Sequence, residues 1–126
     1  MGLIHTTIML RNPLDGRLAP YEANALVDTG AQHLCLPNHV AVQLQLQTVQ
    51  EREVSTADGK KHKCPYVGPV EVTFGNRTCF VGALVLGDDV LLGAVPMEDL
   101  DLVISPANQS VIVNPETPNI PGAVVK

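Results

Sequence analysis

The chain has 126 residues, of which 45% are hydrophobic and 17% charged, and its formal net charge is −5 at pH 7. This composition predicts one folded domain with an aliphatic core, since there are two Phe, two Tyr and no Trp, and it excludes a disordered chain. The acidic balance argues against a nucleic-acid partner, and no apolar stretch reaches the roughly 18 residues that a membrane span needs.

The first half of the chain is divided by proline and glycine into short segments, which favours strands over long helices. We expect a strand over residues 3–10 and a turn at Asn12 to Gly16, where proline presets one φ angle. A second strand over residues 21–27 leads into Asp28-Thr29-Gly30. Residues 34–37 are extended, and residues 37–44 predict a short helix with Asn38 as its N-cap.

In the second half, residues 45–56 are ambiguous, and we favour a strand. Residues 54–66 predict a hairpin that turns at Asp58-Gly59. Strands are expected over 67–74, 78–81 and 83–86, with a turn at 75–77. A further strand ends at 91–93, and a helix follows over 96–100 with Pro96 near its first turn. The last expected strand covers 110–113. The folded domain is expected to span residues 1–113, followed by a proline-rich tail over residues 114–126.

Three cysteines, Cys35, Cys64 and Cys79, are widely spaced. An odd number without a CxxC pair argues against a disulfide framework and against a zinc site, so we expect small buried thiols. The segment Met1 to Thr6 has no charged stretch followed by an apolar run, which is not typical of a signal peptide. These observations lead us to expect a cytoplasmic protein with no membrane partner.

The triplet Asp28-Thr29-Gly30 follows the apolar run Ala25 to Val27, so its carboxylate leaves a buried strand and enters a loop. Glycine lets the backbone turn tightly, and the Thr29 hydroxyl can bond to backbone groups. Taken alone, this pattern is far more typical of an ordinary turn than of catalysis. Leu91-Leu92-Gly93 lies downstream and precedes the expected helix, which adds a second signal.

These ordered signals, Leu26-Val27-Asp28-Thr29-Gly30-Ala31, the hairpin and Leu91-Leu92-Gly93, make residues 3–113 resemble the retropepsin-like aspartic peptidases, including single-domain bacterial members. The resemblance implies an all-β fold, namely a retropepsin-like acid protease barrel with one or two short helices and one lobe per chain. It also implies an aspartic endopeptidase. Because a single Asp-Thr-Gly is present, the second aspartate of the dyad must come from another copy in a homodimer.

The resemblance also implies roles for individual residues. Its substrate is a peptide or an unfolded protein, and neither a metal nor an organic cofactor is required. The catalytic loop is Asp28, Thr29 and Gly30. The flap and the floor of the substrate site are Ala31, Ala57, Asp58, Gly59, Lys60, Leu92 and Gly93.

Two departures from the family pattern leave alternatives open. The hairpin tip, Asp58 to Lys63, is polar and basic, which suits either a flap tuned to acidic substrates or one that does not close tightly. The chain is then either an active peptidase or a catalytically latent dimer that binds peptides or proteins, and a third alternative is an unrelated small barrel. We expect His33 to face solvent, and we expect Glu98, Asp99 and Asp101 to form a solvated face that complements a helix dipole.

Overall fold

The protein is described by a computed structural model of residues 3–125, in which strands predominate and both helices have six residues. None of the helices in this described part has the length and apolar character that crossing a membrane requires. In chain order the elements are β1 (His5–Arg11), β2 (Tyr21–Val27), β3 (Leu34–Leu36), α1 (Asn38–Gln43), β4 (Thr48–Ser55), β5 (Lys61–Phe74), β6 (Arg77–Val85), β7 (Leu91–Leu92), α2 (Ala94–Asp99), β8 (Leu102–Ser105) and β9 (Ser110–Val113).

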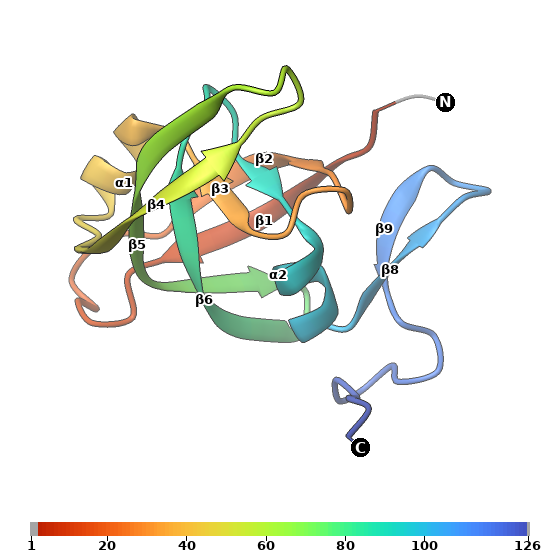
Figure 1. Cartoon of the computed structure of the whole chain (residues 1–126). Coiled ribbons are helices and arrows are strands. Elements are labelled where there is room, and N and C mark those ends of the chain that lie inside the picture. Colours follow the sequence, from red (N-terminus) through yellow and green to blue (C-terminus); the bar gives the residue numbers. More distant parts are fainter. Residues whose placement is uncertain (1–2, 126) are drawn as a thin grey trace.

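The main sheet closes into a barrel. Its seven strands follow the order β1-β2-β7-β3-β6-β5-β4, and an additional pairing of β1 with β5 joins six of them into a ring that leaves β4 outside. The strands β8 and β9 pair only with each other, and their hairpin stands beside the barrel near the start of β1 (Figure 1). This architecture confirms the predicted fold class.

The core fills the barrel with aliphatic side chains, as the composition predicted. Ile8 and Leu10 on β1 and Ala23 and Ala25 on β2 are buried, while their neighbours along each strand are more exposed. This alternation follows from strand geometry, in which successive side chains point to opposite faces. The other core members with no exposed surface include Leu34, Leu36, Val40, Leu44, Val70, Val72, Ala83, Leu92 and Leu100.

Two strands are longer than predicted. β5 runs through the expected boundary at Val67, and β6 runs through Gly82, because the sheet accommodates Gly68-Pro69 with a register shift between Val67 and Val70 and does not end there. The strand β8 was not predicted at all. The turn between β5 and β6 is formed by Gly75 and Asn76, as expected.

The N-terminal ends of both helices differ from the prediction. Pro37 is the N-cap of α1, in place of Asn38, because its extended backbone leads into the first turn and its carbonyl accepts from the Val40 amide. The helix α2 begins after Gly93, so Glu98 lies at its C-terminal end and not near the favourable N-terminal end of its dipole.

Candidate active site

Asp28 lies directly after β2 in a loop whose backbone is well anchored. Its amide donates to the carbonyl of Leu92 (3.0 Å), and its carbonyl accepts from the Ala31 amide (3.1 Å). The Asp28 Oδ1 atom accepts from the Gly30 amide (2.9 Å), which makes the loop an Asx turn. Asp28, Thr29 and Gly30 are all exposed in the single chain, so the carboxylate is held in a defined position at the surface.

The downstream Leu91-Leu92-Gly93 motif forms the floor beneath this loop. β7 pairs in parallel with the end of β2, and Leu92 is fully buried. Gly93 lies directly beneath the loop, where a Cβ atom would come within 2.4 Å of the carbonyl oxygen of His33. The amides of Ala94 and Val95 then donate to the loop carbonyls of Ala31 and Gln32, each at 2.8 Å.

Glycine is therefore required at position 93 for space. Its φ of −88° is an ordinary value, so backbone strain plays no part. At position 30 the reason is also space, because a Cβ atom there would lie 3.1 Å from the Asp28 Oδ1 atom. The motif thus lets the loop that carries Asp28 rest on the start of α2.

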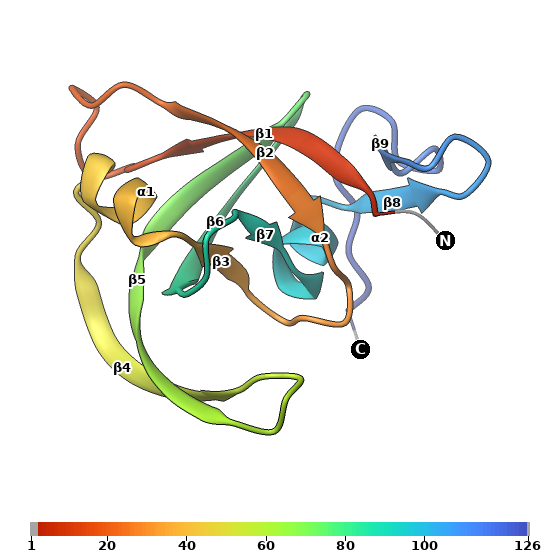
Figure 2. The ribbon, with the colours of Figure 1, turned by 90° about the horizontal axis from the view of Figure 1, so that it is seen from above.

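A cavity of about 670 Å³ opens beside this loop. Figure 2 shows the hairpin of β4 and β5 curving round toward the loop between β2 and β3, and these two segments supply the facing walls. The shape suits an extended chain that lies between the loop and the hairpin. The lining residues are Gly30, Ala31, Gln32, His33, Cys35, Arg52, Glu53, Val54, Ser55, Thr56, Leu84 and Leu86.

The hairpin turns at Asp58-Gly59, as predicted. Asp58 Oδ1 accepts from the Thr56 hydroxyl (2.5 Å) and from the Lys60 amide (2.9 Å), and these bonds lower the pKa of the Asp58 carboxyl. Gly59 has a φ of 81°, a conformation that favours glycine. The predicted flap residues Ala57 to Lys60 lie at this tip, and they are not among the residues that line the cavity of the single protomer.

The cavity wall contains side chains that the sequence did not single out. Arg52 from β4 lies over the ring of Tyr66 from β5, with its Cζ atom 3.8 Å from the ring centroid. His33 packs edge-on against the same ring and is half-buried, so the expectation that it faces solvent was wrong. Burial, followed by the charge of Arg52, lowers the pKa of His33. The alternation of β4, which turns Arg52 and Val54 to one face, is the sequence signal that could have identified Arg52.

The cysteines are free, as expected from their spacing. Cys64 and Cys79 are buried, whereas Cys35 is only partly buried and borders the cavity. Burial, and to a lesser extent the proximity of Cys64 and Asp28, raises the pKa of the Cys35 thiol. The Cys35 side chain is therefore a neutral thiol at neutral pH and not a thiolate nucleophile.

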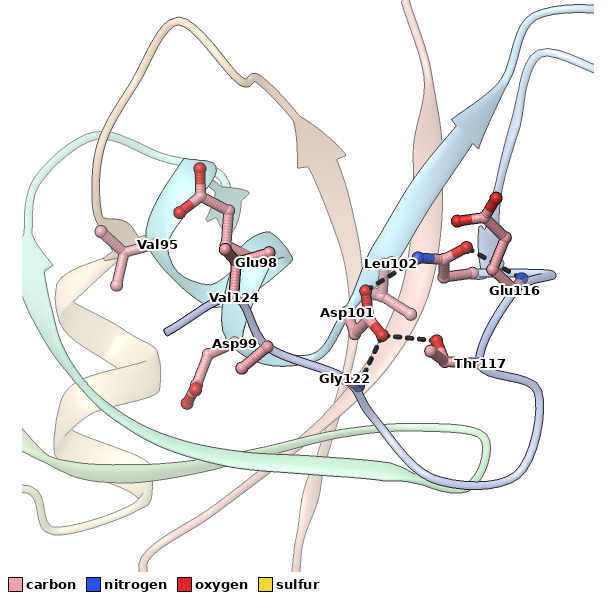
Figure 3. A pocket seen from close by; sticks show the side chains of 11 residues that line it. Val95, Glu98, Asp99, Asp101, Leu102, Glu116, Thr117, Gly122 and Val124 are labelled. Carbon is pink, nitrogen blue, oxygen red and sulfur yellow. Dashed lines mark hydrogen bonds between the residues drawn. The ribbon is translucent and has the colours of Figure 1, made fainter. Parts of the chain in front are cut away.

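A second cavity, of about 780 Å³, lies between α2 and the C-terminal segment, away from Asp28 (Figure 3). There Asp101 Oδ2 accepts from the Thr117 hydroxyl (2.5 Å) and the Gly122 amide (2.7 Å), and Oδ1 accepts from Asn114 (3.1 Å). The hydrogen bond from Thr117 lowers the pKa of Asp101 most, followed by those from Gly122 and Asn114. The pKa of Asp101 is brought to about 2. Asp101 therefore anchors the C-terminal segment through these hydrogen bonds, and it is not part of the solvated acidic face that we expected.

The tail also contacts Arg77, the one buried charged residue of the described chain. Arg77 Nη2 donates to the carbonyl of Thr117, and Nη1 lies 3.9 Å from Asp101 Oδ2. Among residues 3–125, no three His, Cys, Asp or Glu side chains are grouped so that they could hold a metal ion.

Comparison with known proteins agrees with this geometry. Residues 14–99, more than half of the chain, match the family described as "gag-polyprotein putative aspartyl protease". Among solved structures, the protease of EIAV in complex with the inhibitor HBY-793 matches with a TM-score of 0.60 and 18% identity, over 79% of this chain and 88% of that one. No curated protein matches the chain. By its matched residues the chain belongs to the gag-polyprotein aspartyl protease family, and its barrel has the retropepsin-like fold.

Proposed function

We propose that the protein is an aspartic endopeptidase in which two copies of Asp28 meet across a homodimer. The observation that carries this proposal is the state of Asp28 itself. Its carboxylate is exposed, Gly30 and Ala31 of the same loop line the cavity, and the loop is fixed from below by Leu92 and Gly93. Family membership adds the chemistry, because aspartic peptidases hydrolyse peptide bonds with a pair of carboxylates.

A second copy is needed because the chain contains one Asp-Thr-Gly. A groove of about 390 Å³ borders Thr29, and most of its lining is apolar: Ala94, Met97, Leu102, Val103 and Ile104, together with Glu98. Ile112 on the neighbouring strand β9 is 36% exposed. An apolar surface next to the catalytic loop supports dimerisation there, because burying it is favourable.

The proposed reaction follows from the pairing of two carboxylates. Two such groups in contact cannot both ionise cheaply, so they share one proton. The ionised Asp28 accepts a proton from a water molecule as the water oxygen attacks the peptide carbonyl. The protonated Asp28 of the second copy donates its proton to the carbonyl oxygen. The proton taken from water then passes to the amide nitrogen as the C–N bond of the tetrahedral intermediate breaks, which releases the amine and the carboxylic acid. Because the dyad titrates as a unit, the rate is expected to follow a bell-shaped pH profile.

The first test is the variant Asp28→Asn, assayed on an unfolded protein substrate. Asparagine cannot exchange the proton, so cleavage should fall by about 100-fold or more. Glu22→Gln is a matched control, because it neutralises an exposed carboxylate on the same strand at the end remote from the loop. Cleavage by Asp28→Asn at the parental rate would show that Asp28 does not carry the reaction. If neither protein cleaves but both bind peptides, the latent binding module is the better description.

The second test asks whether one site uses both chains. When Asp28→Asn is mixed in equal amount with the parent and the subunits exchange, about one quarter of the dimers keep both aspartates under random pairing. The activity per dimer should then approach that fraction. Retention of half the activity would indicate that each chain works alone. Sedimentation as a strict monomer at micromolar concentration would rule out a catalytic pair formed by two chains.

A further inference from the structure

The hairpin of β4 and β5 presents different charges on its two faces. Residues directly opposite each other on paired strands share a face. Arg52 lies opposite Cys64, and Val54 lies opposite His62, and both Arg52 and Val54 line the cavity. The other face carries the pairs Glu53–Lys63 and Ser55–Lys61; Glu53 and Ser55 also border the cavity at its edge of the strand, but Lys61 and Lys63 do not. Lys61 and Lys63 therefore belong to the outer face, and Arg52 is the Lys or Arg residue that lines the cavity.

Three neutral groups hold the Arg52 guanidinium in position. Its plane stacks over Tyr66, and its Nη1 atom lies 3.5 Å from His33 Nε2. With the Gln50 amide turned so that its oxygen faces Arg52, that oxygen accepts from Nε (3.0 Å) and Nη2 (3.2 Å). A guanidinium has five N–H donors, so this set leaves hydrogen-bonding capacity unused.

The position of Tyr66 is itself determined by the fold. Its ring occupies the space above Gly82, where a Cβ atom would come within 2.1 Å of the ring. His33 packs edge-to-face against the same ring, with the two ring centroids 6.0 Å apart. The arrangement of Arg52 is therefore a consequence of packing between β4, β5, β6 and the Asp28 loop, and not of one flexible side chain at the surface.

The positive charge in the cavity is not neutralised by the protein. Within residues 3–125, no carboxylate lies at ion-pair distance from Arg52. Glu53 borders the cavity, but its carboxylate lies 3.6 Å from Lys61 Nζ on the outer face.

We propose that this cavity is a specificity subsite for a glutamate side chain of the peptide substrate, and that Arg52 is the residue that recognises it. The inference rests on the proposed peptidase function and adds its substrate preference. A planar guanidinium binds a carboxylate through two parallel hydrogen bonds, and Arg52 is held on the wall that faces the catalytic loop. A substrate carboxylate would supply the charge partner that the described chain does not.

The test uses fluorogenic peptides in which one glutamate is moved through the positions that flank the cleaved bond, each paired with the same peptide carrying glutamine. At one position the parent should prefer glutamate by about tenfold or more in kcat/KM, as expected for a hydrogen bond between charged groups. Arg52→Met, which keeps a long apolar side chain over Tyr66, should reduce this ratio to about one. Arg52→Lys should keep the ratio above one, and higher salt should lower it in the parent.

Lys63→Met is the matched control, because it removes one positive charge from the outer face of the same hairpin. It should leave the glutamate-to-glutamine ratio unchanged. The inference is overturned if no position prefers glutamate, if Arg52→Met keeps the preference, or if Lys63→Met abolishes it equally.

A binding measurement separates this inference from the peptidase proposal. Fluorescence anisotropy with the same peptide pairs, added to the parent and to Asp28→Asn, does not require turnover. If no peptide is cleaved but the glutamate peptide binds tighter in an Arg52-dependent way, the peptidase proposal fails and the subsite stands. Equal binding of both peptides, or no binding, rejects the subsite.

Discussion

Adding one methyl group at Gly93 should damage both the stability and the activity of the protein. In Gly93→Ala the new Cβ atom would lie 2.4 Å from His33 O and 2.8 Å from Ala31 O, which are backbone atoms that cannot rotate away. Relief of these contacts requires the loop to rise by about 1 Å, since ordinary contacts between carbon and oxygen exceed 3 Å.

Such a shift disrupts the two hydrogen bonds that join the loop carbonyls to the amides of Ala94 and Val95, each 2.8 Å long. Each bond contributes about 1 kcal/mol net, and overpacking adds about 1–3 kcal/mol. Two such bonds and the overpacking together lead us to expect that Gly93→Ala loses about 3–5 kcal/mol of unfolding free energy. Because the same loop carries Asp28, and a 1 Å misplacement can cost about 100-fold in rate, cleavage should fall to a similar degree.

Urea unfolding at one fixed protein concentration measures the first effect, and peptide cleavage measures the second. Gly16→Ala is the control, because a Cβ atom at Gly16 meets nothing within 4 Å. If Gly93→Ala matches Gly16→Ala in both assays, then the loop does not depend on Gly93 for its position and our account of the Leu-Leu-Gly motif is wrong.

Two further variants test the cavity wall and the tail. Gly82→Ala should displace the Tyr66 ring, reduce stability by about 1–3 kcal/mol through overpacking, and lower the glutamate-to-glutamine ratio in peptide cleavage; an unchanged ratio would show that Tyr66 does not position the guanidinium. Asp101→Asn should destabilise the protein at pH 6 but much less near pH 2. The reason is that the pKa of Asp101 is about 2 in the folded state and 3.8 ordinarily, so its stabilisation is complete above about pH 5 and is lost as pH falls through 2. Urea unfolding of both proteins across this pH range measures the difference, and a difference that does not vary with pH would contradict the role assigned to Asp101.

Local patterns were sufficient to predict many features of this protein. The apolar alternation of β1 and β2, the Asp58-Gly59 turn and the order of the motifs around Asp28 all depend on neighbouring residues, so they can be recognised in the sequence. The ends of elements were less predictable. The sequence predicted breaks before Val67 and at Gly82, but β5 and β6 continue through them because their partner strands hold the ladder on both sides.

Some residues of the candidate site could likewise be identified from the sequence, and others could not. Asp28 and Gly93 were identified from the sequence, but the reason for Gly93 became clear only in the fold, where the backbone of residues 31–33 lies on top of it. His33 was misjudged because its burial depends on Tyr66, which is far away in the chain. Asp101 was misjudged because its hydrogen-bond partners come from the tail.

By itself, the sequence determined the presence of short strands and turns, because these depend on local patterns, and the order of its motifs identified the fold class and the Asp28 loop through their resemblance to the retropepsin-like peptidases. The tertiary structure decided which side chains face the cavity. The basic run at the hairpin tip suggested a preference for acidic substrates, and pairing of β4 with β5 assigns that charge to Arg52 and turns Lys61 and Lys63 to the other face. The physical reason is that a register between strands is set by contacts across the whole sheet, and a shift of one residue would exchange the two faces.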